Sequence, residues 1–126
     1  MAKIKEIRLS GTTTTAGAVT VNATKAVAGK LFAVAFDKGT LADATNFVVS
    51  AQVYDVVKTL LTVTSAGAAD AFYYPRDLVH DASAAALVGT AGGDRTMPLF
   101  VGIPRLAITS GGSGKTGGVI IFYEED

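Results

Sequence analysis

The hydrophobic positions of this chain follow the two-residue period of β-strands in several short runs. Residues 46–54 alternate most regularly, since Phe47 and Val49 fall on one side and Ser50 and Gln52 on the other. Further strands are predicted at residues 5–9, 30–36, 59–64, 70–74, 97–101, 105–109 and 118–123, and the composition of residues 12–15 and 19–21 allows either an extended segment or a loop. Gly, Ser, Thr, Asn and Asp separate these runs, so the pattern predicts an all-β chain.

Two of the runs differ from the others because they are apolar on both faces. Residues 30–36 and 118–123 read as strands covered on both sides, which is typical of central positions in a packed sheet. Gly102 and Pro104 interrupt the apolar stretch between residues 97 and 109, so we expect two short strands there.

Residues 77–88 fit two structures. Asp77 could cap a helix that the following alanines favour, whereas a turn at residues 81–83 would give strand–turn–strand. We favour the second, because each half is short and no 3.6-residue stripe forms. The whole pattern predicts one domain, residues 1–126, folded as a compact antiparallel β-sandwich or barrel, jelly-roll-like, with little or no helix. Residues 1–28 could form an extended N-terminal arm.

Composition indicates a protein that contacts other proteins. Hydrophobic residues make up 49% and charged residues 17%, below the ~25% typical of soluble domains. The surface must therefore consist largely of Thr, Ser, Gly and Ala. Lys plus Arg and Asp plus Glu are equal at 11 each, with no basic cluster, so we expect no nucleic acid and no membrane as partner.

The candidate motifs for catalysis or cofactor binding are weak. The Gly-Lys-Thr at residues 114–116 lacks the first glycine of a phosphate-binding loop, which would fall at Thr109, and a strand follows it. The single histidine, His80, has Asp81 and Ser83 beside it in sequence, where neighbouring side chains of a strand point apart. The chain has no cysteine, which excludes disulfides and Cys-ligated zinc. We therefore expect no enzymatic activity, no cofactor and no metal.

The segment Tyr73, Tyr74, Pro75 and Arg76 is the candidate interface or structural anchor. Tyrosines suit core or interface packing, and the planar guanidinium of Arg76 bonds well to carboxylates and carbonyls. Arg76 has two roles open to it: bridging to a partner, or pinning the strand end through an internal ion pair.

The order of these features resembles capsid decoration (cement) proteins and minor head proteins of tailed bacteriophages. The resemblance runs over residues 29–123, and Tyr-Pro-Arg at residues 74–76 after a Leu-Thr strand is its distinctive element. It implies a virion protein, made in the host cytoplasm, that binds the major capsid protein on the outer capsid surface. It also implies a homo-oligomer, with a trimer favoured. The alternatives are a neck, tail-tube or fibre-base component, or a ligand- or carbohydrate-binding β-sandwich.

Overall fold

The structure is a computed structural model that describes residues 3–78 and 95–125. These residues form strands and no helix, so the all-β prediction is confirmed. The strands are β1 (Lys3–Thr12), β2 (Val19–Asn22), β3 (Val27–Asp37), β4 (Asn46–Val53), β5 (Val56–Val63), β6 (Ala71–Tyr73), β7 (Asp77–Leu78), β8 (Arg95–Thr96), β9 (Leu99–Thr109) and β10 (Thr116–Glu125).

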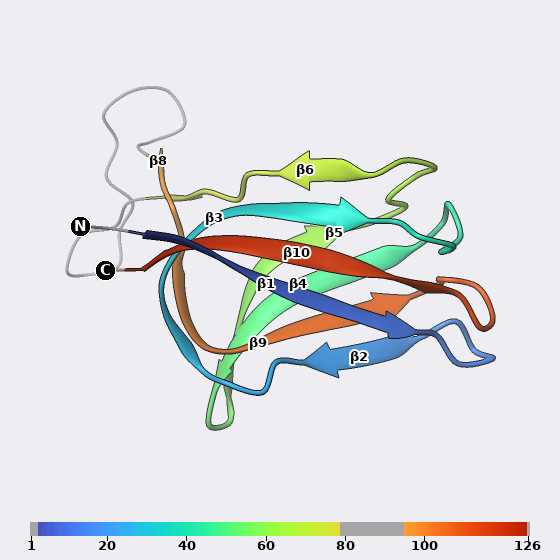
Figure 1. Ribbon diagram of the computed structural model, residues 1–126, viewed down its shortest axis with the longest axis horizontal. Coiled ribbons are helices and arrows are strands. Elements are labelled where there is room, and N and C mark those ends of the chain that lie inside the picture. Colours follow the sequence, from blue (N-terminus) through green and yellow to red (C-terminus); the bar gives the residue numbers. More distant parts are fainter. Residues whose placement is uncertain (1–2, 79–94, 126) are drawn as a thin grey trace.

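Eight of the strands form one antiparallel sheet that folds over into two layers (Figure 1). The first sheet has the order β1-β10-β3-β6, and the second sheet has the order β2-β9-β4-β5. The two are continuous where Val27–Lys30 of β3 pair with Leu99–Gly102 of β9. The stretch that we considered as an extended arm, residues 1–28, supplies β1 and β2 to the two sheets.

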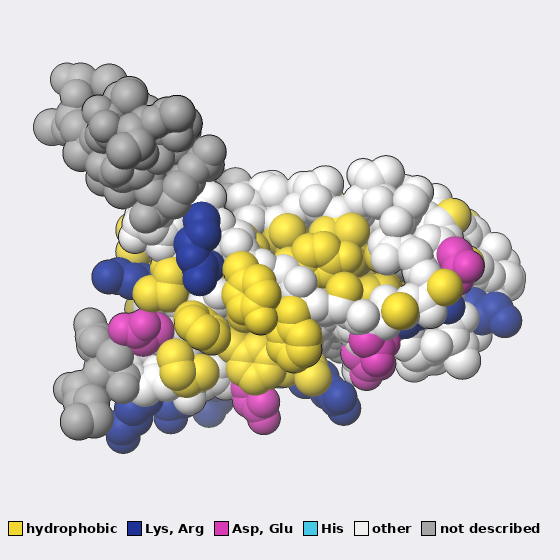
Figure 2. Space-filling view, turned by 90° about the horizontal axis from the view of Figure 1, so that it is seen from above, with side chains coloured by type: hydrophobic (Ala, Val, Ile, Leu, Met, Phe, Trp, Pro, Cys, Tyr) yellow, Lys and Arg dark blue, Asp and Glu magenta, His cyan; other side chains and the backbone are white. Residues whose placement is uncertain are grey.

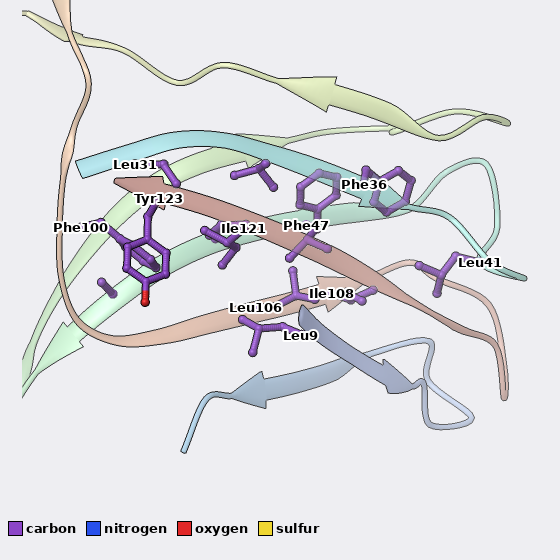
Figure 3. Close-up of a cluster of buried hydrophobic side chains, with 14 residues drawn as sticks. Leu9, Leu31, Phe36, Leu41, Phe47, Phe100, Leu106, Ile108, Ile121 and Tyr123 are labelled. Atoms are coloured by element: carbon purple, nitrogen blue, oxygen red, sulfur yellow. The ribbon is translucent and has the colours of Figure 1, made fainter. Parts of the chain in front are cut away.

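The core lies between the two sheets, where alternate residues of facing strands meet. Phe36 of β3 stacks on Phe47 of β4 with ring centroids 4.8 Å apart, which joins the layers near the middle (Figure 3). The core cluster consists of Leu9, Leu31, Val34, Phe36, Leu41, Phe47, Val49, Ala51, Phe100, Leu106, Ile108, Val119, Ile121 and Tyr123.

Strand β3 is not covered evenly on both faces as the sequence predicted. Its register against β10 shifts between Phe122 and Tyr123, which leaves Phe32 as one extra residue opposite them. On one side of this extra residue Val34 and Phe36 face the core, and on the other side Leu31 does. An inserted residue reverses the alternation of inward and outward side chains, so Phe32 points outward. Phe32 is consequently 40% exposed.

The apolar stretch near Gly102 and Pro104 is a single long strand, β9, and the prediction of two short strands was wrong. The Pro104 carbonyl accepts a hydrogen bond from the Ala23 N–H at 2.9 Å. In a strand, the nitrogen of a residue faces the same side as its carbonyl. The Pro104 nitrogen therefore faces the connection between β2 and β3, where no ladder bond requires a donor.

The glycine-rich loop at residues 110–115 crosses from β9 in the second sheet to β10 in the first. Buried Thr13 holds this loop: its hydroxyl donates to the Gly112 carbonyl at 2.5 Å and accepts from the Lys115 N–H at 2.9 Å. Loops 13–18, 38–45, 64–70 and 110–115 gather at one end of the sandwich (Figure 1). We call this the loop end.

Of the segment 77–88, the structure describes only residues 77 and 78, which form β7 and pair with β8. The choice between helix and strand–turn–strand for the rest of this segment lies outside the described residues, as does His80.

Candidate interaction surfaces

The exposed large hydrophobic side chains are unevenly distributed over the molecule. None of those in the described residues belongs to the four loops of the loop end. They are Ile4, Phe32, Val53, Tyr54, Val56, Val57, Phe72, Tyr74, Leu99, Val101 and Ile103. Clustered exposed apolar residues are typical of surfaces that bind a partner.

The first cluster lies on the outer face of the first sheet and is called the aromatic patch: Phe72, Tyr74 and Phe122. The Phe72 ring is inclined by 16° to that of Tyr74 and by 27° to that of Phe122, with centroids 6.5 Å apart in both cases. Phe72 is 62% exposed and Tyr74 is 59% exposed. Figure 2, which views the molecule from above, shows hydrophobic side chains gathered in the middle, with charged side chains mainly to the left of them and below. The patch offers a broad apolar surface to a partner.

The four predicted anchor residues divide between the core, the surface and a backbone contact. Tyr73 turns inward, and its ring packs edge-on against Phe47 with centroids 5.9 Å apart. Tyr74 turns outward into the aromatic patch, and Pro75 is half-buried. Arg76 Nη1 donates to the Phe32 carbonyl at 3.1 Å and to the Pro75 carbonyl at 2.6 Å. Arg76 thus fixes the segment after β6 onto β3 through carbonyl oxygens, and it forms no ion pair with a carboxylate whose side chain the structure describes.

The second cluster surrounds a hollow of about 630 Å³ next to the β4–β5 hairpin, which we call the hairpin groove. Its apolar walls come from Ala26, Val27, Val53, Tyr54, Val101 and Ile103. Gly102 lies between two of these residues on β9. A Cβ at Gly102 would lie 2.5 Å from the Gln52 carbonyl oxygen and 2.9 Å from Val53 Cγ2, so the close approach of β9 and β4 requires glycine.

Tyr54 stands at the rim of the hairpin groove in an unusual conformation. Its φ is 53°, in the left-handed region that aromatic residues rarely adopt, and its side chain is 92% exposed. The Gln52 side-chain amide donates to the Tyr54 carbonyl at 2.8 Å, which holds the turn in this shape. Strained backbone at an exposed aromatic residue is characteristic of functional positions.

Charge is distributed unequally between the two sheets. The first sheet carries residues of both signs, and Arg8 and Asp37 lie 3.6 Å apart across its outer face. The four strands of the second sheet contain Lys58 and Arg105 but no Asp or Glu.

Arg105 lies on that outer face beside the hairpin groove. Its register partners are Ser50 of β4 and Asn22 of β2, and Asn22 also lines the groove. The Arg105 Nε is buried and has no hydrogen-bond partner. No carboxylate whose side chain the structure describes pairs with the guanidinium. A buried donor that has lost its water without gaining an acceptor is costly, whereas the Arg105 side chain as a whole is only half-buried.

Sequence reasoning missed the hairpin groove. Two signals for it are present: a glycine inside an apolar run at Gly102, and Tyr54-Asp55 as the tip between two β-runs. Neither signal shows that residues 26–27, 53–54 and 101–103 meet, because that follows from strand pairing across the chain.

Among the residues that the structure describes, Tyr123 is the titratable group that burial perturbs. Its ring packs edge-on against Phe100, with centroids 5.4 Å apart (Figure 3). Burial raises the pKa of Tyr123 above its ordinary value of 10.0, and the nearby charge of Glu125 raises it further.

No protein-family model, curated protein or solved structure matches this chain significantly. Among the residues that the structure describes, no group of three or more His, Cys, Asp or Glu side chains is arranged to hold a metal ion. The described part of the chain also contains no helix with the length and apolarity to cross a membrane.

Proposed function

We propose that this chain is a structural protein of a bacteriophage virion that binds the outer surface of the capsid and stabilises the shell. The observation that carries the proposal is the pair of apolar surfaces, the aromatic patch on the first sheet and the hairpin groove beside the second. The low charge of the chain and the resemblance to decoration proteins over residues 29–123 support the same function.

Two separate contact surfaces suit a protein that holds neighbouring subunits together. One surface would suffice to attach to a single subunit, whereas a chain with two can span the boundary between two subunits. Each contact then needs only modest strength, because simultaneous engagement raises the overall affinity by about 10²–10⁴-fold over either contact alone. The paired, layered strands give the rigid frame that such bridging requires.

Co-sedimentation with expanded capsids, assembled from the major capsid protein of the same phage, tests this function. We expect the chain to pellet with capsids and to raise the temperature at which they come apart. Phe72→Ser combined with Tyr74→Ser should weaken binding, because it removes the exposed part of the aromatic patch. Ile4→Ser is the matched control, since Ile4 is 56% exposed and lies outside both surfaces.

The copy number per particle separates the proposed function from its nearest alternative. A decoration protein approaches the number of capsid subunits, whereas a neck, tail-tube or fibre-base component is present in few copies. Density maps of whole particles measure this number directly. Failure to pellet with capsids, together with a low copy number, would contradict the proposal.

A further inference from the structure

We propose that the hairpin groove and Arg105 together form a docking site for a segment of the capsid protein that presents an apolar side chain next to a carboxylate. This inference deepens the proposed function and rests on it for the source of the segment. It assigns a chemistry to one of the two surfaces.

The groove explains the apolar half of this preference. Its hollow of about 630 Å³ falls within the range of 300–1,000 Å³ that small-ligand pockets span, so a peptide side chain fits inside it. Val101 and Ile103, on its walls, are 47% and 40% exposed, so an apolar occupant would remove their surface from water. Tyr54 at the rim adds a large aromatic surface that loses little side-chain entropy on binding.

Arg105 explains the carboxylate half. Asn22 lines the groove and lies directly opposite Arg105, and Ile103 lies two residues before Arg105 on the same face of β9. Arg105 is therefore the next outward-facing residue after Ile103, on the side of the groove that Asn22 lines. Carboxylates pair with arginine through charge-assisted hydrogen bonds, and no strand of the second sheet supplies one.

The conformation of Tyr54 supports a binding role for this rim. A left-handed φ at an aromatic residue costs folding stability, and Asn or Gly would avoid most of that cost. The exposed ring makes no ring-stacking contact with another aromatic side chain of the described residues. Keeping tyrosine here makes physical sense if the ring contacts a bound segment.

Capped dipeptides test the chemistry without capsids. N-acetyl-Leu-Asp-amide is titrated into the ¹⁵N-labelled full chain, with N-acetyl-Leu-Asn-amide as the neutral comparison, and amide shifts are followed by NMR. We expect the largest shifts at residues 101–105 and 52–54, and about fivefold tighter binding of the aspartate peptide. Equal affinity of the two peptides, or shifts elsewhere on the molecule, would overturn the inference.

Three variants sharpen the result. Arg105→Gln should reduce the preference for the aspartate peptide to about onefold, while Arg8→Gln, the same change on the first sheet, should leave it intact. Tyr54→Asn should weaken binding of both peptides and at the same time raise the midpoint of unfolding, because it relieves the strained turn. Loss of binding through misfolding would lower that midpoint instead and would count against the role of the rim.

Capsid binding and self-association are measured in parallel. Arg105→Gln should weaken co-sedimentation with capsids while the aromatic patch is unchanged. If capsid binding is normal in this variant, the inference fails and the proposed function stands. If the peptides bind as expected but no variant binds capsids, the proposed function fails. Self-association in sedimentation velocity that Arg105→Gln abolishes would identify a second copy as the occupant and overturn the capsid protein as its source.

Discussion

Replacing Gly102 with alanine should destabilise the protein by two separable effects. The new Cβ would lie 2.5 Å and 2.8 Å from the carbonyl oxygen and carbon of Gln52, which belong to a paired strand and cannot move aside cheaply. Gly102 also has φ +115°, a conformation that residues with a side chain rarely adopt. Backbone strain of this kind costs about 1–3 kcal/mol. Overpacking against a fixed neighbour adds about 1–3 kcal/mol.

Gly67 provides a matched control for this substitution. Its φ is +94°, but an added Cβ at Gly67 would meet no atom within 4 Å. Gly67→Ala therefore carries the conformational cost alone, about 1–3 kcal/mol, whereas Gly102→Ala carries both, about 2–6 kcal/mol. The difference between the two variants isolates the clash of β9 with β4.

Urea-induced unfolding followed by far-UV circular dichroism measures both free energies of unfolding. Equal slopes of free energy against urea concentration would show that the variants unfold between comparable states. If Gly102→Ala costs no more than Gly67→Ala, the close approach of β9 and β4 at the floor of the groove is not rigid, and our account of its shape is wrong.

Three further predictions concern the core, the loop end and the pH dependence. Phe47→Ala should lower the free energy of unfolding by about 3–5 kcal/mol, measured by urea titration, because it removes the ring that stacks on Phe36 between the sheets. Thr13→Val, of similar shape, should cost about 1–3 kcal/mol in the same assay, because it strips the loop at residues 110–115 of its hydroxyl partner. The pKa of Tyr123 is raised in the folded state, so this tyrosine ionises at a lower pH in the unfolded chain than in the folded one. The free energy of unfolding should therefore be unaffected by Tyr123 below about pH 10 and should fall above it. Tyr123→Phe should make that fall shallower.

The threonine substitution has a control on the same molecule. Thr15→Val changes an exposed threonine and should leave stability within about 0.5 kcal/mol of the parent chain. A Thr13→Val variant as stable as Thr15→Val would show that solvent can replace the Thr13 contacts.

The alternation of residues was a sound guide to where β4 lies and which way its side chains face. Phe47, Val49 and Ala51 are buried as the pattern predicts, because a strand with one covered face must place every second residue in the core. The same reasoning misplaced Phe32, since the bulge that turns it outward depends on the register between β3 and β10. Local reasoning also predicted a break at Pro104, whereas β9 continues through it. The proline nitrogen faces a side of the strand where no ladder hydrogen bond requires a donor.

The candidate surfaces were predictable only in part. Tyr74 was named from its place in an aromatic run, and it is exposed in the structure. Tyr73, its neighbour, turns into the core, because consecutive residues of an extended chain point to opposite sides. The sequence did not identify Arg105 as a candidate binding residue, because nothing in the pattern distinguishes it from the other residues among the 11 Lys and Arg. Its unpartnered Nε becomes visible only once β2 and β4 lie on either side of it.

The sequence by itself determined that this chain builds strands, where most of them run, and that its surface carries little charge, because periodicity and composition are local properties. The tertiary structure decided which strands are neighbours. It therefore also decided which side chains of different strands combine into one surface. The hairpin groove and Arg105 depend on contacts between residues 22–27, 50–54 and 101–105, which are far apart along the chain. Pairing over such separations follows from the burial of the whole core, which no single run of residues encodes.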